Sequence, residues 1–304
     1  MGPNHLEEDL ILDFIIHTGV IMKKSPGTVK LRIAAIRSKH LSLGLPDPFY
    51  YMPRVPLALS GLKRRWGTPE RRLPVTPEML KWLQKQLKPE TFATDALLWA
   101  AICLGFFFLL RASEYLEVGY RQPHRGLFGR HVILQKKGVP ITRAELGQAD
   151  EVVVTIQGSK TDVYNKGETR NHFRVPATLD DPNPLCVVRA VELLFHHFPQ
   201  RMEGGYEQDT PLLTELNGKL MTRETVQTAL KMAARALGIN VARLGSHSLR
   251  FGGASALWAA YHDSGLVRRW GRWASDTFQS YIWEGRKGSQ GVAKSMGQAD
   301  LTPT

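Results

Sequence analysis

The chain has 304 residues, of which 43% are apolar and 22% charged, an ordinary globular balance that excludes a disordered or fibrous protein. This length allows two modest domains, each with its own buried core. Lys and Arg number 40 against 28 for Asp and Glu, and the net charge of +12 favours a polyanionic partner, nucleic acid or an anionic membrane. The alternative interpretation is that the positive charge serves only to keep the protein soluble.

The two cysteines, Cys103 and Cys186, lie far apart and outside any CxxC motif. This spacing argues against a disulfide framework and a cysteine zinc site, and it suits a reducing compartment. The longest apolar run, 96–110, is shorter than the about 20 residues that span a bilayer, so we expect a buried core helix and no membrane association. The polar, acidic amino end predicts no signal peptide.

The first part of the chain is expected to be helical, with Thr28 as the N-cap of its second helix. Hydrophobic spacing places helices at 6–20, 28–42 and 55–65.

A basic segment, 63–74, follows these helices and contains Gly and Pro. It is typical of a solvated linker or of a strap along a phosphate backbone, and both can hold. We therefore predict a domain boundary here, with domains at 1–68 and 69–304.

The second part combines helices with a few strands. Thr76 and Pro77 are typical of a helix start. The last two of the three strand-like runs flank a polar loop, which predicts a hairpin. Strands are expected at 131–135, 151–156 and 172–176. Helices are expected at 77–87, 93–117, 184–198, 222–237, 247–260 and 264–270. The predicted fold class is mainly α with a small antiparallel β-sheet.

Motifs for nucleotide, zinc and serine-hydrolase chemistry are missing: the sequence has no G-x-x-x-x-G-K-[ST], G-x-G-x-x-G, H-E-x-x-H or G-x-S-x-G. The His196-His197 doublet is interpreted as a core or surface pair rather than a metal site. We therefore expect no cofactor and no metal.

Charged residues stand out at the end of the apolar run and in the predicted hairpin. Arg111 follows the run, and Glu114 lies three residues later on the same helical face, a spacing that a structural salt bridge would explain. A charge at this place is costly unless it is paired or meets a ligand. Lys160 lies in the hairpin loop, where a lysine is normally just solvated.

The stretch GSHSLRFGGAS lies near the carboxyl end. Ser246 is expected to cap a helix whose first turn carries His247 and Arg250 on one face, where the helix dipole favours an anion. Gly252 and Gly253 cost roughly 1 kcal/mol each in a helix relative to Ala. We therefore expect another part of the chain to pack closely against that backbone.

The last stretch is GRWASD, with Tyr281 eight positions after Trp273. In order, Arg-x-x-Glu, a hairpin Lys, His-x-x-Arg, Gly-x-Trp and a Tyr resemble the tyrosine recombinase family, relatives of phage integrases and type IB topoisomerases. LLRASEYL, SHSLRFGGAS and GRW with a nearby YI look most similar to the recombinases of DIRS-like retroelements and Crypton transposons. The resemblance covers about residues 28–290. It implies a two-domain DNA clamp, a helical core-binding domain followed by an α+β catalytic domain.

The resemblance also implies a role for each residue. Tyr281 would attack a backbone phosphodiester and form a 3′-phosphotyrosyl link, which conserves the bond energy so that religation needs no ATP. Arg111 and Arg250 would hold the non-bridging oxygens of the scissile phosphate with forked donors. Glu114 would brace Arg111.

Proton transfer is assigned in the same way. Lys160 would protonate the leaving 5′-oxygen, and His247 would hydrogen-bond the phosphate and assist proton movement with Tyr281. Trp273 occupies the place of a histidine in many family members, and because its indole N–H can only donate, it would orient and pack.

Two of these assignments have rivals. Trp273 precedes Tyr281 by eight positions, where family members more often show nine, which makes Arg272 a rival for Trp273. Lys166, farther along the hairpin loop, is a rival for Lys160.

The resemblance implies a recombinase or integrase of a mobile element that acts on double-stranded DNA as a tetramer on two sites. Its location would be the nucleus of a eukaryotic host, and otherwise the cytoplasm or nucleoid. DNA contacts are expected from basic residues of the first domain and the linker, namely Lys30, Arg37, Lys63, Arg64, Arg65, Arg71 and Arg72.

Three other functions are compatible with parts of this pattern. A catalytically silent DNA-binding protein derived from such an enzyme would show no cleavage. A topoisomerase-like enzyme would nick and reseal without needing paired sites. A basic scaffold that does not bind DNA would be insensitive to DNA competitor.

Overall fold

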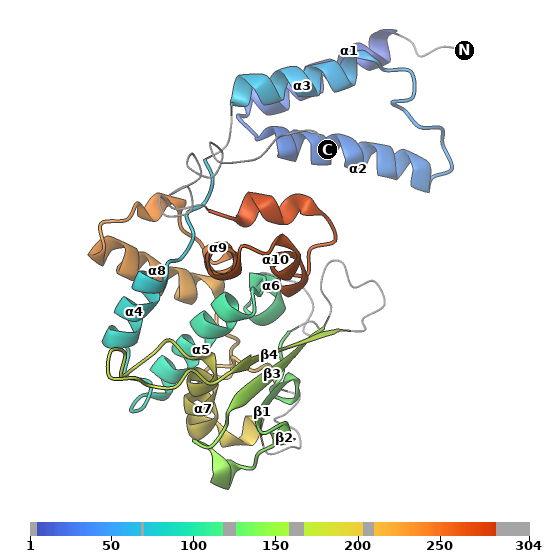
Figure 1. Cartoon of the computed structure of the whole chain (residues 1–304). Coiled ribbons are helices and arrows are strands. Elements are labelled where there is room, and N and C mark those ends of the chain that lie inside the picture. The colour runs from blue at the N-terminus through green and yellow to red at the C-terminus, as the bar shows by residue number, and fades with distance from the viewer. Residues whose placement is uncertain (1–4, 68–69, 118–125, 158–166, 203–209, 284–304) are drawn as a thin grey trace, which may run out of the picture. The chain divides into compact units, whose positions relative to one another are not determined.

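The computed structural model describes residues 5–67, 70–117, 126–157, 167–202 and 210–283. The chain divides into two compact units, Met1–Arg71 and Arg72–Thr304, and the boundary lies within the basic segment that the sequence predicts as a linker (Figure 1). The predicted fold class, mainly helical with a small antiparallel sheet, is confirmed.

The first unit consists of α1 (His5–Ile16), a π-helical turn (His17–Ile21), α2 (Pro26–Ser42) and α3 (Arg54–Trp66). These elements pack around a small apolar core that contains Ile15, Val29, Ile33, Met52, Val55 and Leu62.

The start of α2 differs from the prediction, because Ser25 and not Thr28 is the N-cap. The Ser25 hydroxyl accepts the Thr28 N–H at 3.2 Å. Pro26 takes the first helical position, which suits it because its missing N–H would have had no helical partner.

The second unit contains one antiparallel sheet in the order β2-β1-β3-β4. Its strands are β1 (Val132–Lys136), β2 (Val139–Pro140), β3 (Glu151–Ile156) and β4 (Glu168–Phe173). The predicted β3–β4 hairpin is confirmed, but β4 lies earlier than the predicted 172–176. Its position follows from pairing with β3, in which Ile156 faces Glu168 and Glu151 faces Phe173. The polar sequence ETRNHF forms a strand through this pairing and not through an apolar alternation.

The core of the second unit surrounds α5 (Ala93–Phe107), which contacts α7 (Val187–His197), α8 (Arg223–Ala236) and α9 (His247–Tyr261) (Figure 1). α7 also packs against β1, β3 and β4. α4 (Pro77–Gln86) packs on α8 and begins as predicted, with the Thr76 hydroxyl accepting the Met79 N–H at 3.4 Å.

The predicted helix 93–117 is broken. α5 ends at Phe107, Leu109 has a left-handed φ of +51°, and a new helix, α6 (Ala112–Tyr115), follows Arg111. The break is stabilised locally, because the Glu114 carboxylate accepts the Arg111 N–H at 2.8 Å, as a capping residue does.

α9 carries the His-x-x-Arg stretch and is followed by α10 (Ser264–Trp270) and the 3-10 helix Asp276–Tyr281. The expected close approach at its two glycines is confirmed: a Cβ at Gly252 would overlap the Val75 carbonyl, and one at Gly253 the Phe106 carbonyl. Ser246 takes the expected N-cap position of α9, but its backbone angles are helical and its side chain makes no capping hydrogen bond. The Ser248 hydroxyl accepts the Gly245 N–H instead, at 3.1 Å.

Within the described ranges, no helix combines the length and apolarity that a membrane crossing needs. Cys103 and Cys186 are buried, and neither forms a disulfide.

Candidate active site

Tyr281 lies against the first turn of α9. Its hydroxyl is 3.0 Å from Nε2 of His247, and its ring stacks on that of Phe251, with centroids 4.5 Å apart and planes 19° apart. The phenol and the imidazole belong to the same chain, so they meet without a second copy.

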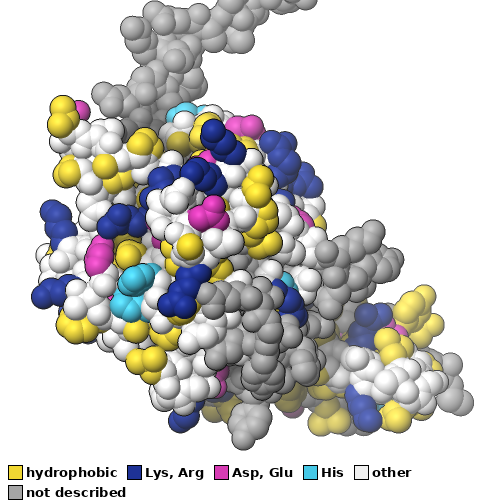
Figure 2. Space-filling view, turned by 90° about the horizontal axis from the view of Figure 1, so that it is seen from below, with side chains coloured by type: hydrophobic (Ala, Val, Ile, Leu, Met, Phe, Trp, Pro, Cys, Tyr) yellow, Lys and Arg dark blue, Asp and Glu magenta, His cyan; other side chains and the backbone are white. Residues whose placement is uncertain are grey.

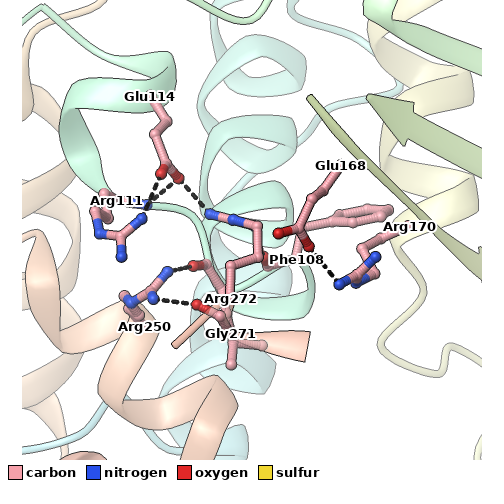
Figure 3. Close-up of polar contacts among 9 residues, drawn as sticks. Phe108, Arg111, Glu114, Glu168, Arg170, Arg250, Gly271 and Arg272 are labelled. Atoms are coloured by element: carbon pink, nitrogen blue, oxygen red, sulfur yellow. Dashed lines mark hydrogen bonds and ion pairs between the residues drawn. The ribbon is translucent and has the colours of Figure 1, made fainter. Parts of the chain in front are cut away.

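Glu114 lies between two arginines (Figure 3). Its Oε1 accepts a hydrogen bond from Arg111 at 2.8 Å and its Oε2 one from Arg272 at 2.6 Å. Burial opposes ionisation of Glu114, but the charge of Arg272 and the donors of Arg111 outweigh it and lower the pKa of the carboxyl. The Arg272 side chain is 1% exposed and that of Arg111 is 22% exposed. Arg111 is therefore the arginine of this pair that can meet a ligand.

Arg250 is fully buried beneath the site. Its two terminal nitrogens donate to the main-chain carbonyls of Leu109 and Gly271 (Figure 3). The Trp273 ring lies over the guanidinium, with 4.3 Å between the ring centroid and Cζ of Arg250. Burial, and next the charge of Arg111, lower the pKa of Arg250 to about 9, so the group remains charged at neutral pH. The donor fork that the resemblance assigns to phosphate is used here by the main chain.

Trp273 and its rival Arg272 take different places. The Trp273 ring lies against the Tyr281 ring, with centroids 4.9 Å apart. Arg272 has a φ of +56° and donates to Glu114 and, at 3.4 Å, to the Phe108 carbonyl. Trp273 therefore lines the phenol, and Arg272 supports the loop that ends α5.

Arg72, which the sequence places among the DNA contacts, also lies at this site. Its guanidinium occupies the space beside Gly245 that a Cβ would fill. The Leu73 N–H donates to the Arg243 carbonyl at 2.9 Å and holds this segment near the start of α9. No motif signals this position, because the bond joins segments far apart in the sequence.

The imidazole of His247 is surrounded by positive charge. Burial, followed by the charges of Arg250, Arg111 and Arg72, lowers the pKa of His247 to about 4. The ring is therefore neutral at physiological pH, and with its proton on Nδ1 it accepts a hydrogen bond from the Tyr281 hydroxyl. Chemically, the site offers the phenol a hydrogen-bond acceptor and surrounds it with positive charge that stabilises an anion.

Comparison with known proteins yields similar structures at low sequence identity. No family model and no curated protein sequence matches the chain. A structure of the XerH site-specific recombinase bound to palindromic difH substrate is 14% identical, with a TM-score of 0.55 over 96% of this chain and 70% of that one. A structure of the Tn1549 transposon integrase in complex with circular intermediate DNA is 11% identical, with a TM-score of 0.52 over 96% and 85%.

The chain has the tyrosine recombinase fold. On this fold, every predicted catalytic residue that the structure describes lies at or beside the Tyr281 site, as does the supporting Glu114. Lys160 and its rival Lys166 lie outside the described residues. Among the described residues, no group of His, Cys, Asp and Glu could hold a metal ion.

The basic residues that the sequence assigns to DNA are all exposed. Lys63, Arg64 and Arg65 lie in the last turn of α3, where the helix dipole favours cations. Arg37 donates to Asp47 at 2.6 Å, which offsets part of its charge. On the face shown in Figure 2, Lys and Arg side chains are scattered with acidic ones between them, so charge there is spread and not concentrated in one patch.

Proposed function

We propose that this chain is a site-specific DNA strand transferase, the recombinase of a mobile element. One observation carries the proposal: on the tyrosine recombinase fold, the Tyr281 hydroxyl lies 3.0 Å from a neutral His247, in a site that contains Arg72, Arg111 and Arg250. A phenol beside a proton acceptor and several guanidinium groups suits attack on a phosphodiester. The stretches LLRASEYL and SHSLRFGGAS, which resemble those of mobile-element recombinases, support the mobile-element role.

The proposed reaction conserves the phosphodiester bond energy. The Tyr281 oxygen attacks phosphorus, the bond between phosphorus and the 5′-oxygen breaks, and a 3′-phosphotyrosyl bond forms. His247 Nε2 takes the phenol proton, and the nearby phosphate charge raises the basicity of this ring. Lys160 supplies the proton to the leaving 5′-oxygen. Reversal by a different 5′-hydroxyl completes strand transfer.

The arginines would act in two ways, according to whether their side chains are exposed or buried. Arg111 and Arg72 contact the phosphate oxygens, because both are at least partly exposed. Arg250 stabilises the developing charge from below, since its donors already bind main-chain carbonyls. Exchange between two sites, each with two cut strands, would require four copies on the DNA.

A covalent-trapping assay tests the proposal. Wild type and Tyr281→Phe are incubated in EDTA with nicked duplexes built from the DNA that flanks the gene, and denaturing gels detect protein attached to DNA. We expect an adduct with wild type only. An adduct that persists in the Phe variant would assign the nucleophile to another tyrosine. DNA that is bound without any adduct would favour a silent DNA-binding protein, and adduct formation followed by resealing without exchange would favour a topoisomerase-like enzyme.

A further inference from the structure

One face of α9 contacts Tyr281 over the first nine residues of the helix, from His247 to Ser255. His247, Phe251 and Ser255 are four residues apart, so they lie on successive turns of the same face. His247 approaches the Tyr281 hydroxyl, Phe251 stacks on its ring, and the Ser255 hydroxyl donates to its main-chain carbonyl at 3.2 Å. The three contacts reach the tip, the ring and the backbone of the tyrosine in turn.

Ser255 also binds the chain beyond Tyr281. Its oxygen accepts the Trp283 N–H at 2.9 Å, so one hydroxyl bridges the main chain on both sides of Ile282. A serine inside a helix usually points to solvent or bonds the carbonyl one turn earlier. Ser255 instead binds a segment 26 and 28 residues away.

The segment that carries Tyr281 thus has an anchor on each side. Phe278, which precedes the tyrosine, is 3% exposed and packs with Leu109, Ala254, Val267 and Trp273. Ser255 holds the main chain at and after the tyrosine. The phenol lies between the two anchors, on the ring of Phe251.

We propose that Ser255 and Phe251 are positioning residues that hold Tyr281 against His247 of the same chain. The inference rests on the proposed function for its effect on rate. In a reaction that depends on in-line attack, a displacement of about 1 Å costs up to about 100-fold in rate. The hydroxyl of Ser255, bonded to the main chain at Tyr281 and Trp283, would act on the reaction through the position of Tyr281.

Substitution of Ser255 tests the inference on the full chain. Ser255→Ala removes the bridge, Ser255→Thr keeps a hydroxyl, and Ser264→Ala is a matched control at an exposed serine of α10. Ser255→Ala should bind the nicked duplex as wild type does and melt within a few degrees of it, since only two hydrogen bonds are lost, but form the covalent adduct about 10- to 100-fold more slowly. Ser255→Thr should recover most of the rate, and the control should be unchanged.

Amide exchange supplies a readout that needs no activity. In the DNA-free protein, the Trp283 amide loses its acceptor in Ser255→Ala and should exchange faster, as measured by hydrogen–deuterium exchange mass spectrometry of the peptide that contains it. Ser255→Thr and Ser264→Ala should retain the wild-type exchange rate.

Phe251→Leu tests the ring contact separately. It removes the stack on Tyr281 while leaving an apolar side chain on α9, and it should slow adduct formation with unchanged DNA binding. A wild-type rate in this variant would remove Phe251 from the proposal.

The two proposals fail in different ways. If wild type forms no adduct, the proposed function fails whatever residue stands at 255. If Ser255→Ala exchanges the Trp283 amide at the wild-type rate, or if Ala and Thr variants form adduct equally slowly, the positioning role of Ser255 is overturned.

Discussion

At the scale of single residues, His247 is the group whose protonation the site controls most strongly. Its folded pKa of about 4 lies below the unfolded value near 6.5, because burial and nearby arginines disfavour the charged ring. Between these values the unfolded chain binds more protons, so the stability from this residue is complete above about pH 6.5 and falls as the pH drops toward 4.

We expect the NMR titration of the His247 ring in the DNA-free protein to have its midpoint near pH 4. The resonance is assigned by its loss in His247→Gln. A midpoint near 6.5 would show that the ring is not in these positive, buried surroundings.

Glu114 is the second residue whose chemistry depends on its neighbours, because it neutralises the buried guanidinium of Arg272. Glu114→Ala should lower the free energy of unfolding by about 3 kcal/mol, since it leaves that charge buried without a partner. Urea unfolding followed by tryptophan fluorescence measures this loss. Glu117→Ala, at an exposed glutamate, is the control and should change stability by less than about 0.5 kcal/mol. Equal stability of the two variants would contradict the ion pair.

At the scale of elements, the break after α5 organises the site. Ending the helix at Phe107 leaves the last carbonyls without helical N–H partners. Long side chains from distant elements take their place: His172 contacts the Phe107 carbonyl at 2.9 Å, and arginines bind the next two carbonyls. The positions of Arg250 and Arg272 therefore depend on where α5 stops.

The packing of α9 on α5 gives a prediction for a helical glycine. Gly253→Ala should destabilise the protein by about 1–3 kcal/mol, because the added Cβ meets the Phe106 main-chain carbonyl, which cannot move freely. Gly61 in α3 has no atom within 4 Å of the same Cβ position, so Gly61→Ala should stabilise the first unit by about 0.5–1 kcal/mol through helix propensity. Urea unfolding compares the two, and a stabilising Gly253→Ala would contradict the close contact.

At the scale of the whole molecule, the second unit contains both the tyrosine and the groups around it. We therefore expect cleavage by a tyrosine of the same chain that binds the phosphate. Mixing Tyr281→Phe, which keeps Arg111, with Arg111→Ala, which keeps Tyr281, should give no more adduct in the trapping assay than the two variants give separately. Recovery of adduct in the mixture would show that one copy donates its tyrosine to another.

The sequence by itself predicts most of the secondary structure and the order of the candidate site residues. Hydrophobic periodicity placed nearly all the helices, two strand-like runs on either side of a polar loop predicted the β3–β4 hairpin, and the glycine pair in α9 indicated a close backbone contact. These features depend on local spacing and on the chemistry of single residues, which a linear pattern records. The same holds for the order of charged and aromatic residues that resembles a recombinase.

Other features were decided only by tertiary structure. The break of α5, the strand formed by polar residues in β4, the burial of Arg250, the different positions of the Trp273 and Arg272 side chains, and the bridge made by Ser255 all depend on partners far away in the sequence. A buried donor or acceptor must find a partner wherever packing brings one, and packing is a property of the whole core. For that reason the sequence could offer candidate residues for the site, while the fold determined which of them face the phenol and which bind the main chain beneath it.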